Sequence, residues 1–498
     1  MGAPIPKDAR LKGPFQPMRF EATVDDCVVS HGEIPEDLAG GFYRVGPTWK
    51  RPTKQGTNAL LSMDGMVQGM VFEDGKAHFK NRWVKTPKYL LEEKHGQGMF
   101  EWEDGGFGDY RSWGYGNVKR DEHTMGVPQG TNNVNIFPFN GQMVASGEQG
   151  GPPIAIDPIS LETVGIVDWS AKLPEGVNPR AAYGDAAFTA HPKWDDATGE
   201  LYGWAYKDTA PYVTITKISP DGGVKSLELH DAPYNTVAHD IWLTQDYIVM
   251  PFQPFIISQD RVKAGLGIFG WKTELPIVIG LIPRDLEGPV RWIDADIEPE
   301  YIMHTLSANI VDNKLYLDAP IFDRPPFPFE TDVKDGQAPP LFFSIAMSTM
   351  GRWTVDLETG KATSERLSDR PTELPKMDER YYGRGYEWGY MIGGDTKGSG
   401  MSMKSLIVQN MKTLKEDEFR IRADGSPPSA VLEATFAPRH KGAKEGDGYV
   451  IVPVSRWAEN LGEYQIFDTE DITQGPVAIV DVPFRLGWTA HGHWMDFR

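Results

Sequence analysis

The chain has 498 residues, of which 40% are hydrophobic, and its 70 Asp and Glu against 50 Lys and Arg give a formal net charge of −20. This charge argues against nucleic acid as a partner, because phosphate binding depends on clustered basic side chains. With 15 Trp and 23 Phe the chain can bury a large core, and its single cysteine, Cys27, excludes an intramolecular disulfide.

The N-terminal residues 1–7 lack the apolar stretch of a secretory signal. Apolar runs such as residues 275–282 are too short to cross a bilayer. We therefore expect no transmembrane segment and a cytoplasmic location, whereas the sequence leaves the oligomeric state open.

Short strand-like segments separated by turn residues follow one another along the chain. Turn signals rich in Asp, Asn and Gly occur at residues 73–76, 196–199, 220–223, 311–314 and 358–361. Each lies between segments rich in β-branched and aromatic residues, a pattern typical of antiparallel hairpins. Long helices are scarce in a chain with 53 Gly and 39 Pro, and one short helix is expected over residues 87–93. The sequence therefore predicts an all-β fold.

No change of composition divides the chain, and so we expect a single domain spanning residues 1–498. Strict repeats are not visible, but seven irregular blades of roughly 70 residues each would account for the length. We expect a seven-bladed β-propeller with long loops and short helices capping its top face, and a multi-sheet sandwich is the alternative. Two segments rich in Phe and Pro, residues 251–257 and 325–329, could line an entrance to a site or pack in the core.

Four histidines lie beside strand patterns, far apart in the sequence: His191, His239, His304 and His491. Neutral imidazole is the protein nitrogen donor that best suits a ferrous ion. In a radial β-fold, one residue from each of four sheets can meet on the central axis. Taken singly, each histidine could equally be a surface residue or a hydrogen-bonded core residue. Six others lie in charged, turn-rich stretches and are expected to face solvent: His31, His78, His95, His123, His230 and His440.

Short motifs around these histidines, in a fixed order over nearly the whole length, identify a family resemblance. They are the segment 32–40 with Tyr43-Arg44, Met63-Asp64-Gly65-Met66-Val67, the segment 81–86, Ala190-His191-Pro192-Lys193-Trp194-Asp195, Thr198-Gly199-Glu200, Pro483-Phe484-Arg485-Leu486 and His491-Gly492. The chain resembles the carotenoid cleavage oxygenases, and within them the lignostilbene dioxygenase-like branch.

The resemblance implies a seven-bladed β-propeller with one Fe(II) per subunit on its axis, bound by His191, His239, His304 and His491. His493 competes for the last position, but the ligand in the family motif stands directly before a glycine, which favours His491. The resemblance also implies glutamates that accept hydrogen bonds from the ligand imidazoles and thereby fix their tautomer and orientation. The alternative for each glutamate is a solvated surface position. The matching residues are Glu148, Glu373 and Glu433.

The reaction that the resemblance implies is cleavage of a C=C bond in a stilbenoid or phenylpropanoid-like alkene into two carbonyl products, with O2 and without an organic cofactor. In lignostilbene dioxygenases a tyrosine and a lysine bind the phenol oxygen of the substrate. Tyr110 matches the tyrosine, whereas Gly147 stands at the lysine position. The missing lysine favours apocarotenoid cleavage as the alternative. Two further alternatives are an oxygen-independent isomerohydrolase and a metal-free propeller that serves as a binding scaffold.

Overall fold

A computed structural model describes residues 12–52, 54, 63–102, 118–148, 151–173, 188–329, 346–394 and 403–498. Within these ranges the chain is nearly all β, and two α-helices are present, α1 (Pro87–His95) and α2 (Gln259–Lys263). The expected helix is confirmed as α1, where the Thr86 side chain accepts a hydrogen bond from the backbone N–H of Tyr89 and Gly96 ends the helix at a φ of 73°. The described residues also include four short 3-10 helices: Gly13–Phe15, Asp168–Lys172, Glu379–Tyr381 and Ile472–Gln474.

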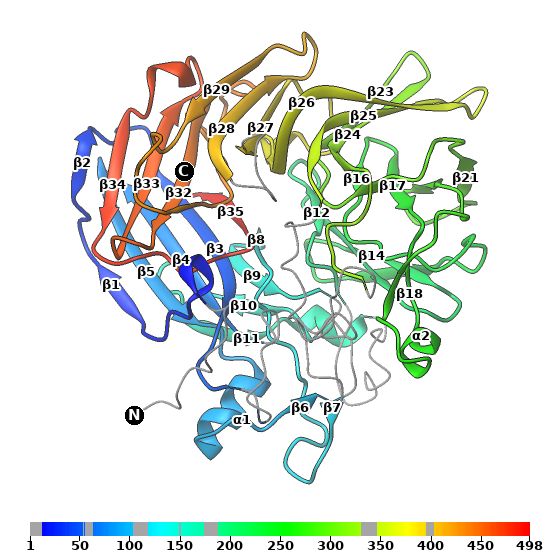
Figure 1. Ribbon diagram of the computed structural model, residues 1–498, viewed down its shortest axis with the longest axis horizontal. Coiled ribbons are helices and arrows are strands. Elements are labelled where there is room, and N and C mark those ends of the chain that lie inside the picture. The colour runs from blue at the N-terminus through cyan, green and yellow to red at the C-terminus, as the bar shows by residue number, and fades with distance from the viewer. Residues whose placement is uncertain are drawn as a thin grey trace.

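The strands form antiparallel sheets that follow one another in chain order around a common centre (Figure 1). The first sheet has the order β1 (Ala22–Val24), β5 (Lys76–Trp83), β4 (Asp64–Glu73), β3 (Gly40–Thr48) and β35 (His491–Asp496). The second has the order β11 (Thr163–Ile166), β10 (Ile154–Ile156), β9 (Gln142–Ser146) and β8 (Asn135–Phe139). The third has the order β12 (Lys193–Asp195), β13 (Glu200–Tyr206), β14 (Val213–Ile218) and β15 (Val224–Glu228).

The remaining large sheets continue around the centre. One has the order β16 (Trp242–Leu243), β17 (Tyr247–Phe252), β20 (Val278–Pro283) and β21 (Arg291–Asp294). An eight-stranded sheet joins β22 (Tyr301–Ile302), β24 (Lys314–Phe322), β25 (Ser348–Asp356), β26 (Ala362–Lys376), β27 (Trp388–Gly394), β28 (Met403–Asn410) and β29 (Glu416–Arg420), with β23 (Ser307–Val311) beside β24. The last joins β2 (Val29–Gly32), β34 (Ala478–Val482), β33 (Leu461–Asp468), β32 (Gly448–Arg456) and β30 (Ala430–Val431), with β31 (Thr435–Pro438) beside β32.

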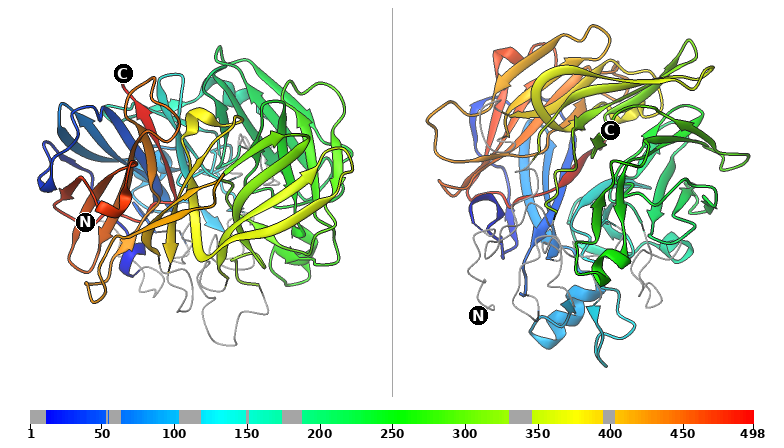
Figure 2. Two further views of the ribbon diagram at one scale, coloured as in Figure 1. Left: turned by 90° about the horizontal axis from the view of Figure 1, so that it is seen from above. Right: turned by 45° about the vertical axis from the view of Figure 1, so that its right-hand side comes forward.

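Two smaller hairpins, β6 (Glu101–Trp102) with β7 (Val118–Lys119) and β18 (Phe255–Ile257) with β19 (Phe269–Trp271), stand apart from these sheets. Figures 1 and 2 show α1 and the β6–β7 hairpin projecting beyond the sheets at one edge of the molecule. No helix in the described ranges is long and apolar enough to cross a membrane.

The two ends of the chain exchange strands between the first and the last sheet. The early strand β2 pairs with β34, and the final strand β35 pairs with β3, where His491 lies opposite Val45. Each exchange pairs backbone hydrogen-bonding groups of β34 or β3 that would otherwise be left open at the edge of the sheet. The first and last sheets are therefore tied to each other, and His491 is held in place by that tie.

The five predicted turns are confirmed as hairpin connections. They join β4 to β5, β12 to β13, β14 to β15, β23 to β24 and β25 to β26. In the first of them Asp74 and Gly75 have φ values of 49° and 69°. Positive φ at both central residues is the geometry that lets two twisted strands reverse tightly, and Asp-Gly adopts it readily.

Aromatic side chains of the segment 251–257 pack in the core between sheets. Phe252 and Phe255 are fully buried, and the ring of Phe255 stacks on that of Phe327 with centroids 5.6 Å apart. Core packing, rather than the lining of an entrance, is the role of these two rings.

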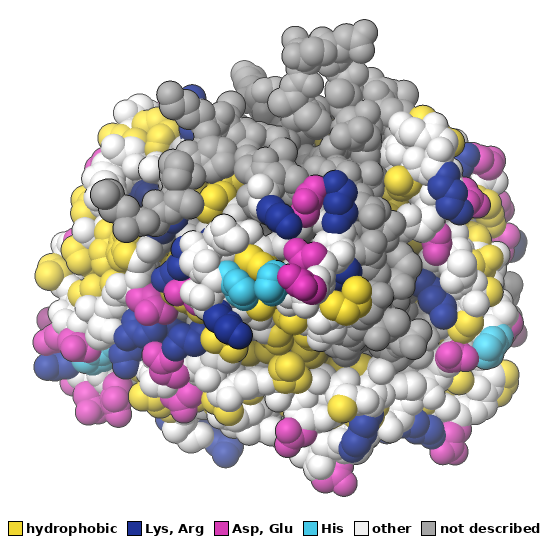
Figure 3. All heavy atoms as spheres, turned by 90° about the horizontal axis from the view of Figure 1, so that it is seen from below, with side chains coloured by type: hydrophobic (Ala, Val, Ile, Leu, Met, Phe, Trp, Pro, Cys, Tyr) yellow, Lys and Arg dark blue, Asp and Glu magenta, His cyan; other side chains and the backbone are white. Residues whose placement is uncertain are grey.

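On the face of the molecule shown in Figure 3, basic and acidic side chains of the described residues are mixed with one another.

Candidate metal centre

Four histidine side chains from distant parts of the chain meet at the centre of the ring of sheets. His191 lies two residues before β12, His239 lies three residues before β16, His304 lies between β22 and β23, and His491 begins β35. The strands β12, β16, β22 and β35 each stand at one end of their sheet's strand order, and Figure 1 shows β12 and β35 near the centre. The sheets therefore deliver one imidazole each to a shared point.

Each of the four rings is within contact distance of at least two of the others. The ring centroid of His191 lies 4.5 Å from that of His239, 4.9 Å from that of His304 and 4.4 Å from that of His491. The centroids of His304 and His491 are 4.7 Å apart. One nitrogen atom from each of His191, His239 and His304 lies within 4.8 Å of the other two.

Unpartnered nitrogen atoms show what this cluster could hold. The Nε2 atoms of His191, His239 and His304 are buried and have no hydrogen-bond partner among the described residues. A buried polar atom without a partner is costly, and three that face each other are satisfied together by one cation. The cluster therefore fits a metal ion, and its all-nitrogen donor set suits a first-row transition metal better than Mg²⁺ or Ca²⁺.

Three glutamates approach the opposite ring nitrogens. The Nδ1 atom of His304 lies 2.7 Å from Oε2 of Glu373, and the Nδ1 atom of His491 lies 2.8 Å from Oε1 of Glu433. The third pair is looser, since 3.7 Å separates Nδ1 of His239 from Oε1 of Glu148. A carboxylate on Nδ1 keeps the proton there and leaves the Nε2 lone pair directed at the cluster.

Neutral donors hold the looser carboxylate in place. Glu148 accepts a hydrogen bond from the Tyr206 hydroxyl at 2.9 Å and another from the backbone N–H of Ala190 at 3.1 Å. Because Ala190 directly precedes His191, Glu148 fixes the backbone before one imidazole and lies beside the ring of another. The sequence motif that carries His191 therefore also contributes to orienting the site.

Burial and neighbouring charges set the protonation of the imidazoles. Burial, together with the other three histidines, holds the pKa of His191 well below its usual value. Burial also lowers the pKa of His491, to about 4, against the opposing effect of Glu433. The pKa of His304 is raised instead, because Glu373 outweighs the burial of the ring. A neutral imidazole is the form that binds a metal, and His191 and His491 are held in that form at neutral pH.

A second layer of charged residues lies behind His491. The Nδ1 atom of His493 is 2.6 Å from Oε1 of Glu379, and its ring meets the edge of Trp194 with centroids 5.0 Å apart. Lys376 lies between Glu379 and Glu433. Neither Lys376 nor Glu379 was singled out by the sequence, although Lys376 follows Glu373 by three residues in the segment 372–376.

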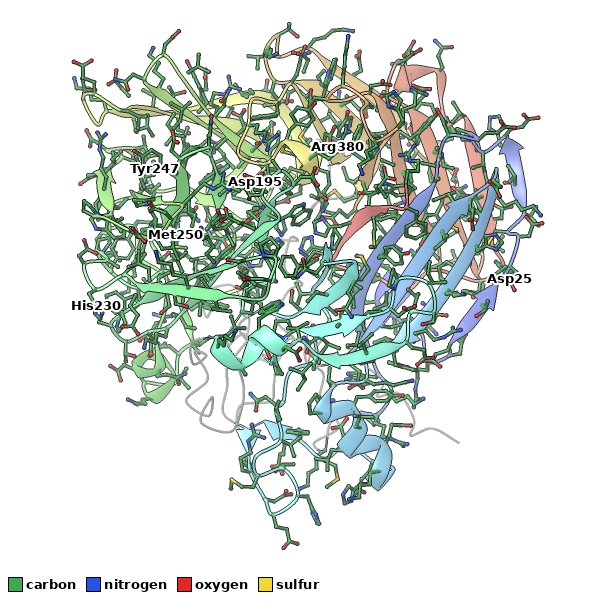
Figure 4. The ribbon with its side chains drawn as sticks, turned by 180° about the vertical axis from the view of Figure 1, so that it is seen from behind. Asp25, Asp195, His230, Tyr247, Met250 and Arg380 are labelled. Atoms are coloured by element: carbon green, nitrogen blue, oxygen red, sulfur yellow. The ribbon has the colours of Figure 1, made fainter. Side chains whose placement is uncertain are left out.

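The remaining sequence-predicted positions separate into three groups. Gly147 is buried and directly precedes Glu148. Tyr110 lies outside the described residues. Of the six histidines expected to face solvent, four are exposed and two are half-buried, and Figure 4 shows His230 at the outer edge of the molecule, far from Asp195. The exposed group is His31, His123, His230 and His440, and the half-buried pair is His78 and His95.

Comparison with known proteins gives one family over nearly the whole chain. The family described as retinal pigment epithelial membrane protein matches residues 15–496. The chain is 30% identical over 515 residues to lignostilbene-α,β-dioxygenase isozyme III of Sphingomonas paucimobilis, covering 99% of this chain and 98% of the relative. It is 31% identical over 499 residues to isoeugenol monooxygenase of Pseudomonas nitroreducens, covering 98% of each. The crystal structure of Pseudomonas brassicacearum lignostilbene dioxygenase superposes with a TM-score of 0.83 at 29% identity and covers 99% of this chain and 100% of that one.

Proposed function

The chain belongs to the carotenoid cleavage oxygenase family, whose model carries the description retinal pigment epithelial membrane protein, and from this premise we propose that it is a non-haem Fe(II) dioxygenase. It cleaves a C=C bond of a stilbenoid or phenylpropanoid-like alkene into two carbonyl products and uses O2 as cosubstrate. The substrate class follows the names of its relatives, which act on a lignostilbene and on isoeugenol.

One observation carries the proposal: the buried Nε2 atoms of His191, His239 and His304 converge and have no hydrogen-bond partner among the described residues. His191, His239, His304 and His491 would hold one iron per subunit. When bound, the iron supplies the activation of O2 beside the alkene. A scaffold without a metal would have no physical reason to bury these unpartnered nitrogens together.

The protein's own part in the reaction is to orient the ligands and exclude water. Glu373 and Glu433 favour a proton on Nδ1 of His304 and His491, which leaves the Nε2 lone pair of each ring available to a metal. Burial of the rings keeps bulk water away from that place, which protects reactive species from side reactions. Glu148 performs the same orienting role for His239 at a longer distance.

The proposal extends to the architecture and setting of the enzyme. We propose one domain over residues 1–498 with seven propeller blades, short helices capping the top face and a cytoplasmic location. The long strand β26 supports this count, because its first half pairs with β25 and its second half pairs with β27. There are six large sheets among the described residues. If β26 belongs to two successive blades, the eight-stranded sheet comprises two blades, and the six sheets correspond to seven blades.

Cleavage of an apocarotenoid is the second candidate, and Gly147 favours it. A lysine before Glu148 would stabilise a phenolate, whereas glycine at this buried position provides no charge. An alkene that needs no phenolate, such as an apocarotenal, would be accepted without that lysine.

The test is aerobic incubation of Fe(II)-loaded protein under ¹⁸O2 with isoeugenol, resveratrol, a non-phenolic stilbene and an apocarotenal, with products identified by mass spectrometry. Labelled aldehydes from the aromatic alkenes support the leading proposal, and labelled product from the apocarotenal alone supports the second. Boiled protein and anaerobic incubation are the controls. Iron-loaded protein that gives a product without oxygen would replace the dioxygenase by an isomerohydrolase, and protein that does not retain iron would leave only a binding scaffold.

A further inference from the structure

Lys376 is a buried lysine at the end of β26, close to one of the three glutamates of the metal centre. Its Nζ atom donates a hydrogen bond to the carbonyl oxygen of Gly492 at 2.9 Å. The same atom lies 3.6 Å from Oε2 of Glu433 and 3.4 Å from Oε1 of Glu379. A buried ammonium group is costly unless it is paired, so these contacts fix where its charge must lie.

The three glutamates differ in their surroundings. Glu433 has Lys376 within ion-pair distance. Burial acts to raise the pKa of Glu433, but Lys376 and His491 hold it down at about 2. The partners of Glu373 and Glu148 among the described residues, apart from histidine, are neutral donors: the backbone N–H of Leu374, the backbone N–H of Ala190 and the Tyr206 hydroxyl. Among the three glutamates, Glu433 is therefore the one with a lysine within ion-pair distance in the described part of the chain, whereas the other buried lysine near the cluster, Lys193, is paired with Asp240.

This asymmetry affects how strongly each imidazole donates electrons. A carboxylate that accepts the Nδ1 proton raises the basicity of the imidazole at its other nitrogen. A lysine on that carboxylate withdraws part of its charge and weakens the effect. His304, whose Glu373 has no such cation, is then the stronger donor, and His491 is the weaker one.

We propose that Lys376 offsets the charge of Glu433 and so keeps the bound iron in the ferrous state. The inference rests on the proposed iron site and adds a positioning residue to it. Fe(III) carries one more positive charge than Fe(II), so a nearby cation disfavours the oxidised form more than the reduced one. Because Lys376, Glu433 and His491 are all buried, solvent and salt screen this interaction only weakly.

Glu379 is a negatively charged neighbour of Lys376, so its removal should change the electrostatics at Glu433 in the opposite sense to the removal of Lys376. It accepts a hydrogen bond from Nδ1 of His493 at 2.6 Å and lies 3.4 Å from Nζ of Lys376, so it shares the lysine with Glu433. Removing the charge of Glu379 leaves more of the Lys376 charge acting on Glu433. The variants Lys376→Met and Glu379→Gln should therefore shift the Fe(III)/Fe(II) midpoint potential in opposite directions.

The experiment is an anaerobic redox titration of the full chain loaded with Fe(II), with dithionite and ferricyanide as reductant and oxidant and dyes as mediators. The wild type, Lys376→Met, Lys376→Arg and Glu379→Gln are compared after iron has been quantified in each. Ferric iron is followed by electron paramagnetic resonance. We expect Lys376→Met to lower the midpoint potential, Lys376→Arg to leave it near the wild-type value and Glu379→Gln to raise it.

The inference is overturned if Lys376→Met retains iron at the wild-type potential, or if Lys376→Met and Lys376→Arg shift the potential equally. If Lys376→Met does not fold, the direction of the shift in Glu379→Gln decides alone, and an unchanged or lowered potential refutes the inference. Failure of the iron proposal is recognised separately, because the wild-type chain itself would then retain no iron.

Discussion

The Nδ1 atom of His304 lies 2.7 Å from Oε2 of Glu373, although 69 positions separate the two residues in the chain. Both side chains are buried, and the backbone N–H of Leu374 donates a second hydrogen bond to the same carboxylate oxygen at 2.5 Å. The carboxylate therefore has a fixed position from which to hold the imidazole. This pair is the tightest of the three between a glutamate and a histidine of the cluster.

Replacing Glu373 with glutamine tests that pair. Glutamine keeps the size of the side chain but removes the negative charge that favours a proton on Nδ1 of His304. We expect the affinity for Fe(II) to fall about 10- to 100-fold, the range typical of lost carboxylate partners at metal-bound histidines. Competition with a chromogenic chelator measures it. The exposed Glu358→Gln is the matched control, and equal iron affinity in both variants would contradict the role of Glu373.

Removing one imidazole tests the cluster itself. We expect His304→Ala to lose iron and activity while the β-sheets remain, because the fold is maintained by the cores between sheets rather than by this side chain. Iron content after gel filtration and far-ultraviolet circular dichroism are the measurements. The exposed His230→Ala should retain both iron and activity. A fully active His304→Ala protein would refute the proposed site.

Local patterns explain what could be predicted from the sequence. Turn residues such as Asp74-Gly75 act within a few positions, and so the hairpins were predicted correctly. The convergence of four distant histidines was expected from a radial arrangement, and the structure brings those four rings together. Their role as iron ligands stays a prediction.

Long-range pairing explains what the sequence did not reveal. The exchange of β2 and β35 joins opposite ends of the chain, and no local signal encodes such a register. Lys376 and Glu379 look like ordinary surface charges in the sequence, because a buried ion pair is recognised only through its partners. From the sequence, the aromatic stretch containing Phe252 and Phe255 could either line an entrance or pack in the core, and the burial of the two rings in the structure distinguishes these alternatives.

The pKa of His491 predicts how the metal-free protein responds to acid. Burial lowers this pKa to about 4, below the value of about 6.5 in an unfolded chain. As pH falls from about 6.5 toward about 4, His491 binds a proton in the unfolded state but stays neutral in the folded state. The free energy of unfolding therefore decreases. The loss between pH 7 and pH 5 is about 2 kcal/mol for this one group.

Urea unfolding of the chelator-treated chain at pH 7 and pH 5 measures this loss. His304 acts with the opposite sign, since its raised pKa gives stability that is present below about 6.5 and lost as pH rises through the folded value. The variant His491→Asn removes this group, and with it the part of the lowered pKa of His191 that is due to His491. We expect a smaller acid loss in His491→Asn, and an identical loss would show that His491 is not the group responsible.

Gly492 is a position where only glycine fits between two strands. A Cβ atom added there would lie 2.2 Å from the carbonyl oxygen of Tyr43 and 2.4 Å from Cγ of Arg44, both on the paired strand β3. Gly492→Ala must push β35 away from β3 and with it His491. We expect a loss of about 1–3 kcal/mol in the free energy of unfolding together with weaker iron retention. Gly385→Ala is the control, since its nearest heavy atom is Nδ2 of Asn309 at 3.7 Å, and equal effects of the two variants would contradict the steric argument.

Gly147 offers a test of which alkene the enzyme accepts. A phenol has a pKa near 10, and an ammonium group beside it favours the phenolate, which donates electrons into the alkene. If the substrate is a 4-hydroxystilbene, Gly147→Lys should raise kcat/KM for it several-fold and leave kcat/KM for its methyl ether unchanged. Gly147→Met has similar length without the charge and is the matched control. Equal responses to Lys and Met would mean that the pocket does not recognise a phenolate at this position, and the apocarotenoid proposal would then be preferred.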